Sequence, residues 1–370
     1  MSVPPPTPGG TRAAGTTDSS ATLPPVRVLI TGGAGFVGSS LARALAGHHE
    51  VVALDSLRRR GSELTLDRLR TAGVAFVHGD VREPGDLAEA GPFDALVECS
   101  AEPSVMAGVD GGRDFVVHTN LLGAYHCFEA AARHGAQVVF LSTSRVYPVA
   151  GLTALALERR GDRYELAHAQ PLPGASARGI AEDFPLAGAR TLYGATKLAA
   201  EHLLAEYDVP WVVNRCGVIA GPWQMGKVDQ GVFTHWALSH RFGRPLAYVG
   251  FGGAGLQVRD LLHVDDLVAL VERQLEDPQG WHGATYNVGG GRAGSLSLRE
   301  TTALCREISG RQLDLGAVPE TRPGDVPVYL SDCEALFEHT DWRPQRTPRD
   351  ILSDIFAWID DHADLLERTL

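Results

Sequence analysis

A glycine-rich turn near the N-terminus limits the folds open to this chain more than any other feature of its sequence. The turn reads TGGAGFVG, residues 31–38, and it joins the apolar run 26–30 to an amphipathic helical stretch. In such a strand–turn–helix unit, Gly32 permits the tight turn, Gly35 lets the backbone approach a pyrophosphate, and Gly38 lets helix and strand pack closely. The helix N-terminus behind the turn presents free N–H groups to an anion. The motif therefore predicts a dinucleotide-binding domain.

Apolar strands alternate with amphipathic helices through the first 220 residues. This alternation is typical of a parallel sheet that is covered by helices on both faces. We therefore expect an α/β fold, a doubly wound parallel sheet of the Rossmann type with a smaller C-terminal substrate-binding lobe. Strands are expected at residues 26–30, 50–54, 74–78, 93–99, 137–142 and 211–215, and helices at 36–47, 119–134 and 191–207.

An acidic residue at the end of the second expected strand favours one of the two nicotinamide cofactors. Asp55 follows Gly38 by 17 residues. A carboxylate at this place accepts hydrogen bonds from both ribose hydroxyls and repels a 2′-phosphate, which favours NAD. Residues 58–60 are three arginines that could attract a phosphate, so NADP stays the alternative. Asp80, at the end of the third strand, is placed to meet the adenine amino group.

Changes in composition suggest how the chain is divided. Residues 1–25, rich in Pro, Gly, Ser, Thr and Ala, are expected to form a disordered tail. Residues 26–220 are expected to form the NAD-binding Rossmann domain. Residues 221–370 are expected to form mainly the substrate-binding lobe, with some segments returning to the Rossmann domain. The segment 148–189 shows little periodicity, so we expect it to border a site, act as a lid or interface arm, or serve no particular purpose.

Charge and cysteine content exclude several classes of protein. The formal net charge of −12 argues against a broad electrostatic surface for nucleic acid. The five cysteines show neither a CxxC pair nor the spacing of metal ligands, which indicates reduced thiols in the cytoplasm and no metal site. Residues 1–25 lack the apolar stretch of a signal peptide or a membrane span, and no association with a membrane is expected. The 14 histidines also lack the spacing of metal ligands, so a metal-dependent hydrolase is a remote alternative.

A tyrosine and a lysine are spaced to lie on one face of a helix. Tyr193 and Lys197, in YGATK, are four residues apart. A phenol with an ordinary pKa of about 10 is a poor base near neutral pH. A neighbouring ammonium group and a positively charged nicotinamide ring favour the phenolate, so the pair is suited to proton removal. A non-catalytic NAD-binding regulator would be expected to have lost one of these two residues.

The hydroxyl that completes this set lies in LSTSRVYP, residues 141–148. Together with the glycine turn and the Tyr–Lys pair, it resembles the extended short-chain dehydrogenases, the NAD-dependent epimerase/dehydratase family that acts on nucleotide sugars. The resemblance extends from about residue 26 to residue 358. It implies that Thr143 bonds the reacting sugar oxygen and that Asn120, in TNLLG, lies near the nicotinamide side of the sheet.

The residues after Thr143 separate the branches of this family. The resemblance implies Asp and Glu directly after the Thr in 4,6-dehydratases, and Glu two residues after it in decarboxylases. This chain has Ser144 and Arg145 there, so epimerisation is favoured. The segments 55–63, 142–148, 216–231 and 257–263 are similar to CDP-paratose/CDP-tyvelose 2-epimerases, and Asp229-Gln230-Gly231 is the most specific part. The alternatives are a 4-epimerase, whose strand-six motif differs at Val218, and a net sugar oxidoreductase.

The resemblance also implies the roles of individual residues. Tyr193 acts as the base and then the acid, Lys197 lowers its pKa and holds the nicotinamide ribose, and Thr143 orients the C2 oxygen. Family members often pair through two helices, so a homodimer is expected from residues 119–134 and the helix of Tyr193. The expected cofactor contacts are Gly32, Gly35, Phe36, Val37, Gly38, Asp55, Asp80, Val81, Ser100, Asn120, Tyr193 and Lys197. The expected substrate contacts are Glu102, Arg145, Trp223, Gln224, Gln230 and a diphosphate clamp of Arg259 and Arg322.

Overall fold

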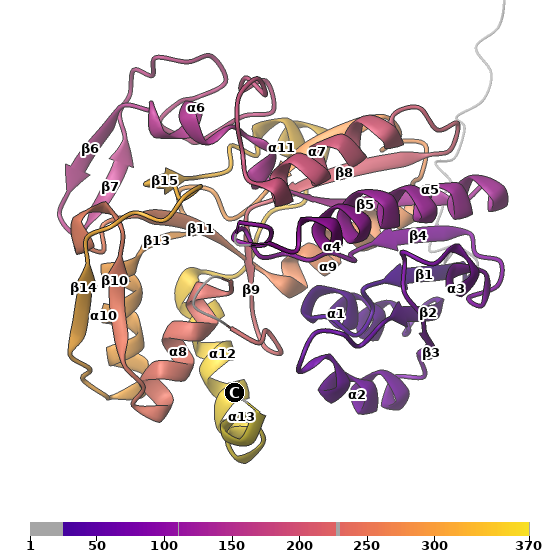
Figure 1. The fold of residues 1–370 in the computed structure, drawn as a ribbon, viewed down its shortest axis with the longest axis horizontal. Coiled ribbons are helices and arrows are strands. Elements are labelled where there is room, and N and C mark those ends of the chain that lie inside the picture. The colour runs from indigo at the N-terminus through magenta and orange to yellow at the C-terminus, as the bar shows by residue number, and fades with distance from the viewer. Residues whose placement is uncertain (1–24, 110, 227–229, 370) are drawn as a thin grey trace, which may run out of the picture.

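A computed structural model describes residues 25–109, 111–226 and 230–369 of the chain (Figure 1). The expected N-terminal tail, apart from Pro25, and the Asp229 of the specific motif lie outside the described residues. Within the described part, a large parallel sheet with its helices stands beside a smaller lobe built mostly from the C-terminal third (Figure 1).

The large sheet has seven parallel strands in the order β3-β2-β1-β4-β5-β8-β12. Successive strands are added on one side of β1 up to β3 and on its other side from β4 onward. Ligands of open α/β sheets bind at this switch in strand order, between β1 and β4. The predicted doubly wound α/β fold is confirmed. The strands are β1 Arg27–Thr31, β2 Glu50–Asp55, β3 Ala75–His78, β4 Ala95–Glu98, β5 Gln137–Thr143, β8 Trp211–Cys216 and β12 Ala284–Val288.

Side chains of successive residues in these strands pack into two different cores. Val28 and Ile30 of β1 face a core shared with α1, α2, α9 and α11, whereas Leu29 faces a core shared with α3, α5 and α7. This is why the strands are apolar throughout rather than alternating. The helices are α1 Phe36–Leu45, α2 Leu66–Thr71, α3 Pro84–Ala88, α4 Arg113–Val117, α5 Gly123–His134, α7 Leu192–Leu204, α9 Val264–Glu276 and α11 Glu334–His339.

The smaller lobe is built around the four-stranded sheet β13-β11-β15 with β9 added to β11, and around the pair β10-β14. Helices α8, α10 and α12 form its core with Phe233, Trp236 and Ile355. The strands are β9 Val218–Ala220, β10 Leu246–Val249, β11 Val258–His263, β13 Ser295–Ser297, β14 Leu315–Val318 and β15 Val328–Tyr329. The helices are α8 Val232–Phe242, α10 Leu298–Ser309, α12 Pro348–Asp361 and α13 Ala363–Thr369.

The predicted helix near the C-terminus is present and begins as expected. Thr347 caps α12 by accepting a hydrogen bond from the backbone N–H of Asp350, and the Asp350 side chain accepts one from the N–H of Thr347. Pro348 occupies the first helical position, where its missing N–H has no intrahelical partner to lose.

The segment 148–189, which shows little periodicity in the sequence, contains regular secondary structure. It contains α6 Val149–Thr153 and the antiparallel hairpin of β6 Leu157–Arg160 and β7 Arg163–Leu166. The hairpin is attached to the small lobe, because the backbone N–H of Tyr164 donates to the carbonyl of Leu256 at 3.0 Å. The domain boundary near residue 220 stays a prediction, since this hairpin and β12 both cross it.

The structure also bears on membrane association. Within the described ranges, no helix combines the length and the apolar character needed to cross a lipid bilayer.

Candidate active site

A cleft of about 570 Å³ lies over the glycine turn, at the carboxyl ends of β1, β2, β3 and β4. A side chain at Gly38 would overlap the carbonyl oxygen of Gly32, and Gly32 itself has a φ of 64°, so both positions require glycine. The first turn of α1 has neither an acidic residue nor a side-chain cap. Its N–H groups are therefore open to a pyrophosphate, and the cleft fits a dinucleotide.

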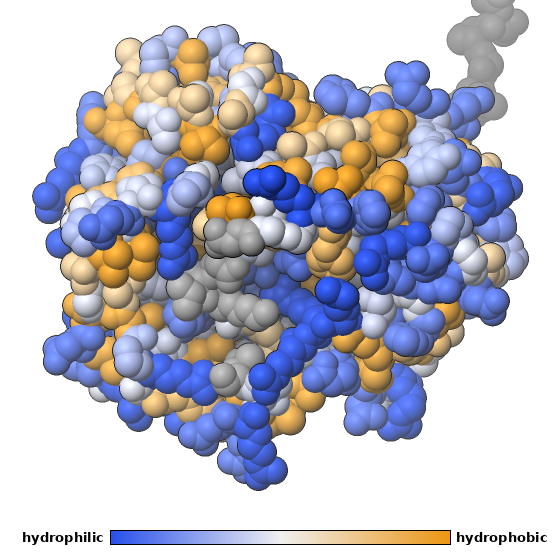
Figure 2. All heavy atoms as spheres, viewed as in Figure 1, coloured by the Kyte–Doolittle hydropathy of each residue, from blue (hydrophilic) through white to orange (hydrophobic). Residues whose placement is uncertain are grey.

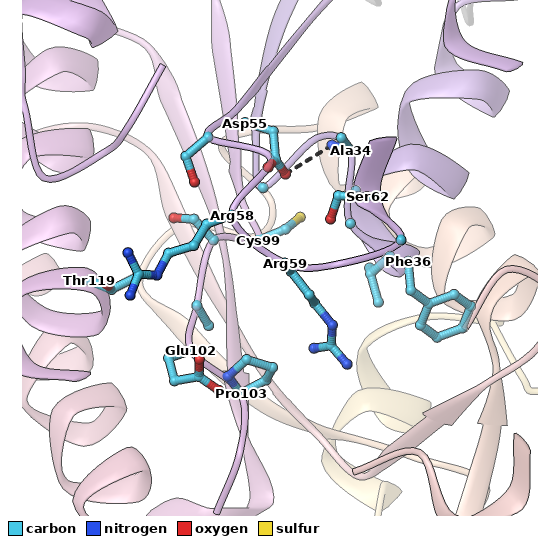
Figure 3. Close-up of a pocket in the computed structure, with 18 of the residues that line it drawn as sticks. Ala34, Phe36, Asp55, Arg58, Arg59, Ser62, Cys99, Glu102, Pro103 and Thr119 are labelled. Carbon is cyan, nitrogen blue, oxygen red and sulfur yellow. Dashed lines mark hydrogen bonds between the residues drawn. The ribbon is translucent and has the colours of Figure 1, made fainter. Parts of the chain in front are cut away.

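Asp55 is held in this cleft by the backbone around it. Its carboxylate accepts hydrogen bonds from the N–H of Ala34 at 3.1 Å and of Leu57 at 2.8 Å. Burial raises the pKa of Asp55, and these hydrogen bonds oppose the shift. Figure 3 shows Arg59 extending into the cleft from the chain after Asp55, while Arg58 extends toward Thr119.

Asp80 lines the same cleft but is already paired. Its carboxylate accepts hydrogen bonds from the Arg82 guanidinium at 2.6–3.1 Å, and these bonds lower the pKa of Asp80. Arg82 and Arg58 both lie against the ring of Phe115, at 5.1 and 4.1 Å from its centre. Phe115 and Arg58 line the cleft, and Arg82 packs behind them on the same ring, a feature that the sequence did not indicate. Contact of Asp80 with adenine stays a prediction.

Asn120 positions the loop after β4 instead of lining the cleft. It is 1% exposed and lies in the π-helical turn η2 His118–Leu122, which continues directly into α5, so the helix expected over 119–134 is present and begins with a π-helical turn. Its side chain accepts a hydrogen bond from the N–H of Glu102 at 2.7 Å and donates one to the Glu102 carbonyl at 3.1 Å. Glu102 itself lines the cleft and accepts from the N–H of Ser104 at 3.2 Å.

A second cavity of about 620 Å³ opens between the large sheet and the small lobe. The two cavities meet, because they share wall residues that belong to α1, to the loop after β4 and to the loop before α8. The shared residues are Phe36, Val37, Cys99, Ala101, Pro103, Gln224 and Gln230. A dinucleotide in the first cavity and a second ligand in the other would therefore touch one another at this junction.

Thr143, Tyr193 and Lys197 come together in the wall of the second cavity. Thr143 ends β5, and Tyr193 lies in the first turn of α7, which Thr191 caps by accepting from the N–H of Gly194 at 3.3 Å. Gly194 is needed because any side chain there would overlap the carbonyl of Arg145. The predicted catalytic set is thus close in space.

Burial raises the pKa of Tyr193. The charge of Lys197 and a hydrogen bond with Thr143 oppose this shift without cancelling it. The residues nearest the phenol therefore favour its ionised form, as a proton-accepting role requires. Burial is the largest single influence on Lys197 and lowers its pKa, but the charge and hydrogen bond of Glu98, together with the charge of Tyr193, outweigh it, so the net pKa is raised.

Glu98 is the residue of this site that the sequence did not reveal. It ends β4 and is 0% exposed, and its Oε2 lies 3.1 Å from Nζ of Lys197. Ser100, expected among the cofactor contacts, donates its hydroxyl to the other oxygen of Glu98. A signal was available, because a carboxylate at the end of the buried run Ala95–Glu98 needs a partner.

Three arginines bring positive charge to the second cavity. Arg145, Arg259 and Arg322 line it, together with Asp325. Arg259 donates to Asp325 at 2.6 Å and to the carbonyl of Val326 at 2.7 Å, so its ion pair is not with the neighbouring aspartates in sequence. Burial lowers the pKa of Arg145 to about 10, and its guanidinium donates to the carbonyl of Gly324 at 3.1 Å.

Trp223 and Gln224 lie at the mouth of the first cavity. Trp223 adopts the left-handed conformation, with a φ of 71°, and the guanidinium of Arg68 lies 4.7 Å from its ring centre. Gln224 donates to the carbonyl of Ile219 at 2.9 Å and accepts from the hydroxyl of Thr234 at 2.8 Å, which holds the loop before α8. Gln224 and Gln230 also reach the second cavity, whereas Trp223 borders only the first among the described linings.

Comparison with known proteins explains this arrangement. A sequence profile described as the NAD dependent epimerase/dehydratase family matches residues 28–289. The chain belongs to this family. The enzyme is 26% identical over 351 residues to CDP-paratose 2-epimerase of Salmonella typhi, which covers 90% of this chain and 99% of that protein.

Two further relatives extend the comparison. The enzyme is 29% identical over 332 residues to dTDP-glucose 4,6-dehydratase of Mycobacterium tuberculosis, covering 87% and 89% of the two chains. The structure of UDP-glucose 4-epimerase of Thermus thermophilus in complex with NAD is similar, with a TM-score of 0.69 and 26% identity over 90% of this chain and 99% of that one. The predictions of NAD as cofactor and of a nucleotide-sugar enzyme are confirmed.

Proposed function

We propose that the enzyme inverts C2 of a CDP-linked deoxyhexose through a transient 2-keto sugar. One observation carries the choice of epimerisation over dehydration. Among the described residues that line the second cavity, Asp325 is the only carboxylate, and Arg259 already binds it at 2.6 Å. Elimination of water needs a free acid and a free base near the sugar, whereas inversion needs only the proton carrier and the hydride carrier.

The residues of the second cavity supply the proton chemistry. Tyr193, as phenolate, removes the proton of the C2 hydroxyl and later returns it to the same oxygen. Thr143 donates to that oxygen and fixes its direction, and Lys197 keeps positive charge beside the phenol. NAD, when bound, accepts the hydride of C2 and gives it back to the opposite face of the sugar. The cofactor is therefore regenerated in each cycle.

The arginines of the second cavity are suited to a diphosphate. Arg259 is fixed in place by Asp325 and by two backbone carbonyls, and its remaining N–H groups can point toward the ligand. We assign the diphosphate to Arg259 and Arg322, because a planar guanidinium binds phosphate oxygens with two parallel hydrogen bonds. Arg145, beside Thr143 in sequence, is assigned to the sugar end of the cavity.

Support for CDP and for C2 comes from the relatives. The CDP-paratose 2-epimerase of Salmonella typhi aligns with nearly the whole described chain. The segment 216–231, whose Gln230 reaches both cavities, carries the resemblance to this group. Inversion at C4, as the name of the Thermus thermophilus relative states for that protein, is the second candidate.

We also propose that the enzyme works in the cytoplasm as a homodimer. Leu122, Tyr125 and Leu203 are 40%, 39% and 38% exposed on η2, α5 and α7. Figure 2 shows apolar side chains over the region where Figure 1 places α7 and α5. Exposed apolar patches of this kind mark association surfaces. A single change of Leu203→Glu should shift the sedimenting species from dimer to monomer, and an unaltered species would contradict the assignment.

The function is tested with purified enzyme and no added NAD, on a panel of CDP-, UDP-, GDP- and dTDP-sugars followed by proton NMR. Changed H1–H2 and H2–H3 couplings of a CDP-sugar, without net NADH, are expected. Changed couplings at H4 would favour the 4-epimerase, and a 4-keto-6-deoxy product would contradict the argument from the missing carboxylates. The Tyr193→Phe variant is the negative control for each sugar.

A further inference from the structure

Glu98, the anion of the buried ion pair beside Tyr193, has no role in the proposed chemistry. Glu98 and Lys197 have side chains that are 1% and 2% exposed, and their charged atoms lie 3.1 Å apart. Lys197 also lies 4.4 Å from the centre of the Phe140 ring, so its ammonium has an apolar wall on another side. A buried ammonium in such surroundings is costly unless an anion faces it.

We propose that Glu98 is a positioning residue of the active site, which holds Lys197 in its charged form and in a fixed place beside Tyr193. This inference rests on the proposed role of Tyr193 as the base, but not on the identity of the sugar or the carbon inverted. Glu98 itself does not line either of the two cavities among the described residues, so it acts through Lys197.

The geometry gives Glu98 two partners that fix both of its oxygens. One oxygen receives the ammonium of Lys197, and the other receives the hydroxyl of Ser100, two residues further along the same chain segment. A carboxylate fixed in this way cannot rotate away from the ammonium. Since Ser100 lines the cofactor cleft, the group that anchors Glu98 also borders the space for the dinucleotide.

Helix α7 takes part in a second buried ion pair, which differs from the Glu98–Lys197 pair in the groups that surround it. Glu201 of α7 binds Arg215 of β8 at 2.8 Å, and Ser142 and Tyr147 complete that network. This pair links helix and sheet, and it lines neither cavity among the described residues. The two pairs have similar burial and different neighbours. Ser142 of the Glu201 network lines the second cavity, but only the Glu98 pair contains the ammonium that acts on Tyr193.

The charged and titratable groups around this site come from four elements. Lys197 faces Tyr193 on its own helix, Glu98 and Cys99 from β4 and the loop after it, and Cys216 from β8. Tyr193 in addition faces Thr143 of β5 and the guanidinium of Arg145. Among these groups Glu98 is the one carboxylate that faces Lys197. Without its charge, burial favours the neutral amine, and a neutral amine no longer favours the phenolate of Tyr193.

The experiment uses the NAD-loaded enzyme and needs no substrate. The near-ultraviolet absorbance of tyrosinate is followed against pH, and the signal of the Tyr193→Phe variant is subtracted to isolate Tyr193. We expect the midpoint of Tyr193 in Glu98→Gln to rise by about one pH unit relative to wild type, because the ammonium beside the phenol is lost. The pH profile of the reaction should move in the same direction, with KM for the sugar unchanged.

The Glu201→Gln variant is the matched control, because it removes the same charge from the other buried pair. It should lower the melting temperature as Glu98→Gln does, but leave the Tyr193 midpoint in place. An unchanged or lowered midpoint in Glu98→Gln overturns the inference. An active Tyr193→Phe enzyme instead overturns the proposed function, so the two failures are distinguishable.

Glu98→Asp keeps the negative charge but places the carboxylate farther from the ammonium of Lys197. This variant replaces Glu98→Gln in the experiment if Glu98→Gln does not fold. Its Tyr193 midpoint should stay near the wild-type value, while kcat falls because the ammonium loses its fixed place. A wild-type kcat in Glu98→Asp would overturn the positioning role.

Discussion

The two cavities of this enzyme are built in opposite ways. The cofactor cleft depends on a short run of consecutive residues, 31–38, whose backbone forms the floor and whose N–H groups stay open. The substrate cavity gathers residues between Phe36 and Asp325 from both parts of the molecule, and Arg259 and Asp325 in its wall are paired with one another. Local sequence therefore determines the first site, whereas long-range packing determines the second.

The difference also concerns what each site can tolerate. The cofactor cleft requires the absence of side chains, since any Cβ at Gly38 would overlap backbone atoms. The substrate cavity requires side chains whose positions are set by ion pairs, such as that of Arg259 with Asp325. Changes in the two cavities should thus affect separate measurable quantities, namely cofactor content for the first and KM for the second.

The largest effect is expected at the proposed proton carrier in the wall of the second cavity. Tyr193→Phe removes the proton carrier but keeps the ring, so turnover should fall about 10²- to 10⁴-fold while bound NAD is retained. Turnover and cofactor content are measured on the same preparation. Tyr164→Phe, on the hairpin strand β7, is the control and should keep full turnover. Loss of NAD together with turnover would show that Tyr193 serves the cleft and not the chemistry.

The next largest effect is expected in the cofactor cleft, on the amount of bound NAD. Gly38→Ala forces the glycine turn away from α1, and overpacking of this kind costs about 1–3 kcal/mol. Bound NAD should fall about tenfold, since about 1.4 kcal/mol corresponds to a factor of ten. Gly47→Ala is the matched control, because its Cβ would come no closer than 3.4 Å to the carbonyl of Ala44. Equal NAD content in both variants would refute a cleft that depends on the bare backbone.

A change in the substrate cavity is expected to alter KM and to leave the amount of bound NAD unchanged. Arg259→Ala should raise KM for the nucleotide sugar about 10- to 100-fold, as the loss of charged hydrogen bonds to a diphosphate predicts, with NAD content unchanged. Steady-state kinetics and the absorbance of released cofactor give the two values. Arg292→Ala, at an exposed arginine of the small lobe, should leave both unchanged. A fall in NAD content with Arg259→Ala would contradict the separation of the two sites.

The features that depend on neighbouring residues in the sequence were predicted well. Each expected strand of the sheet was present within two residues, and the β2 end, the glycine turn and the Tyr–Lys spacing lay where local pattern placed them. These features depend on periodicity or on neighbours a few residues apart. The strand β12 was not predicted individually, because a short apolar run after residue 280 does not reveal which sheet it joins.

The residues that the sequence did not reveal are those whose partners lie far along the chain. Glu98 meets Lys197 across 99 residues, and Asp325 meets Arg259 across 66. A lone sequence contains each residue but not the pairing. The π-helical turn at Asn120 and the hydrogen bonds of its side chain to the backbone of Glu102, 18 residues away, were likewise hidden.

The hairpin of β6 and β7 shows the same limit on a larger scale. Its residues lack a clear period because each strand is short, and its order comes from contacts with a lobe more than 90 residues away. Arg163 bonds Ser295 at 2.6 Å and Glu300 at 3.2 Å, and it lies 2.9 Å from Glu165. Arg163 therefore ties the hairpin to the capped N-terminus of α10.

The smallest effect we predict concerns the hairpin of β6 and β7. It tests whether the hairpin supports only the substrate cavity and not the cofactor cleft. Arg163→Ala should lower the free energy of unfolding by about 1–3 kcal/mol, because hydrogen bonds to charged groups are lost. Denaturant unfolding measures this value, and NAD content should not change, since the contacts of Arg163 lie in the small lobe and the hairpin. Arg159→Ala, at an exposed position of β6, is the control. If the variant loses bound NAD as well as stability, the hairpin supports both cavities. Only the glycine turn would then be built from local sequence alone.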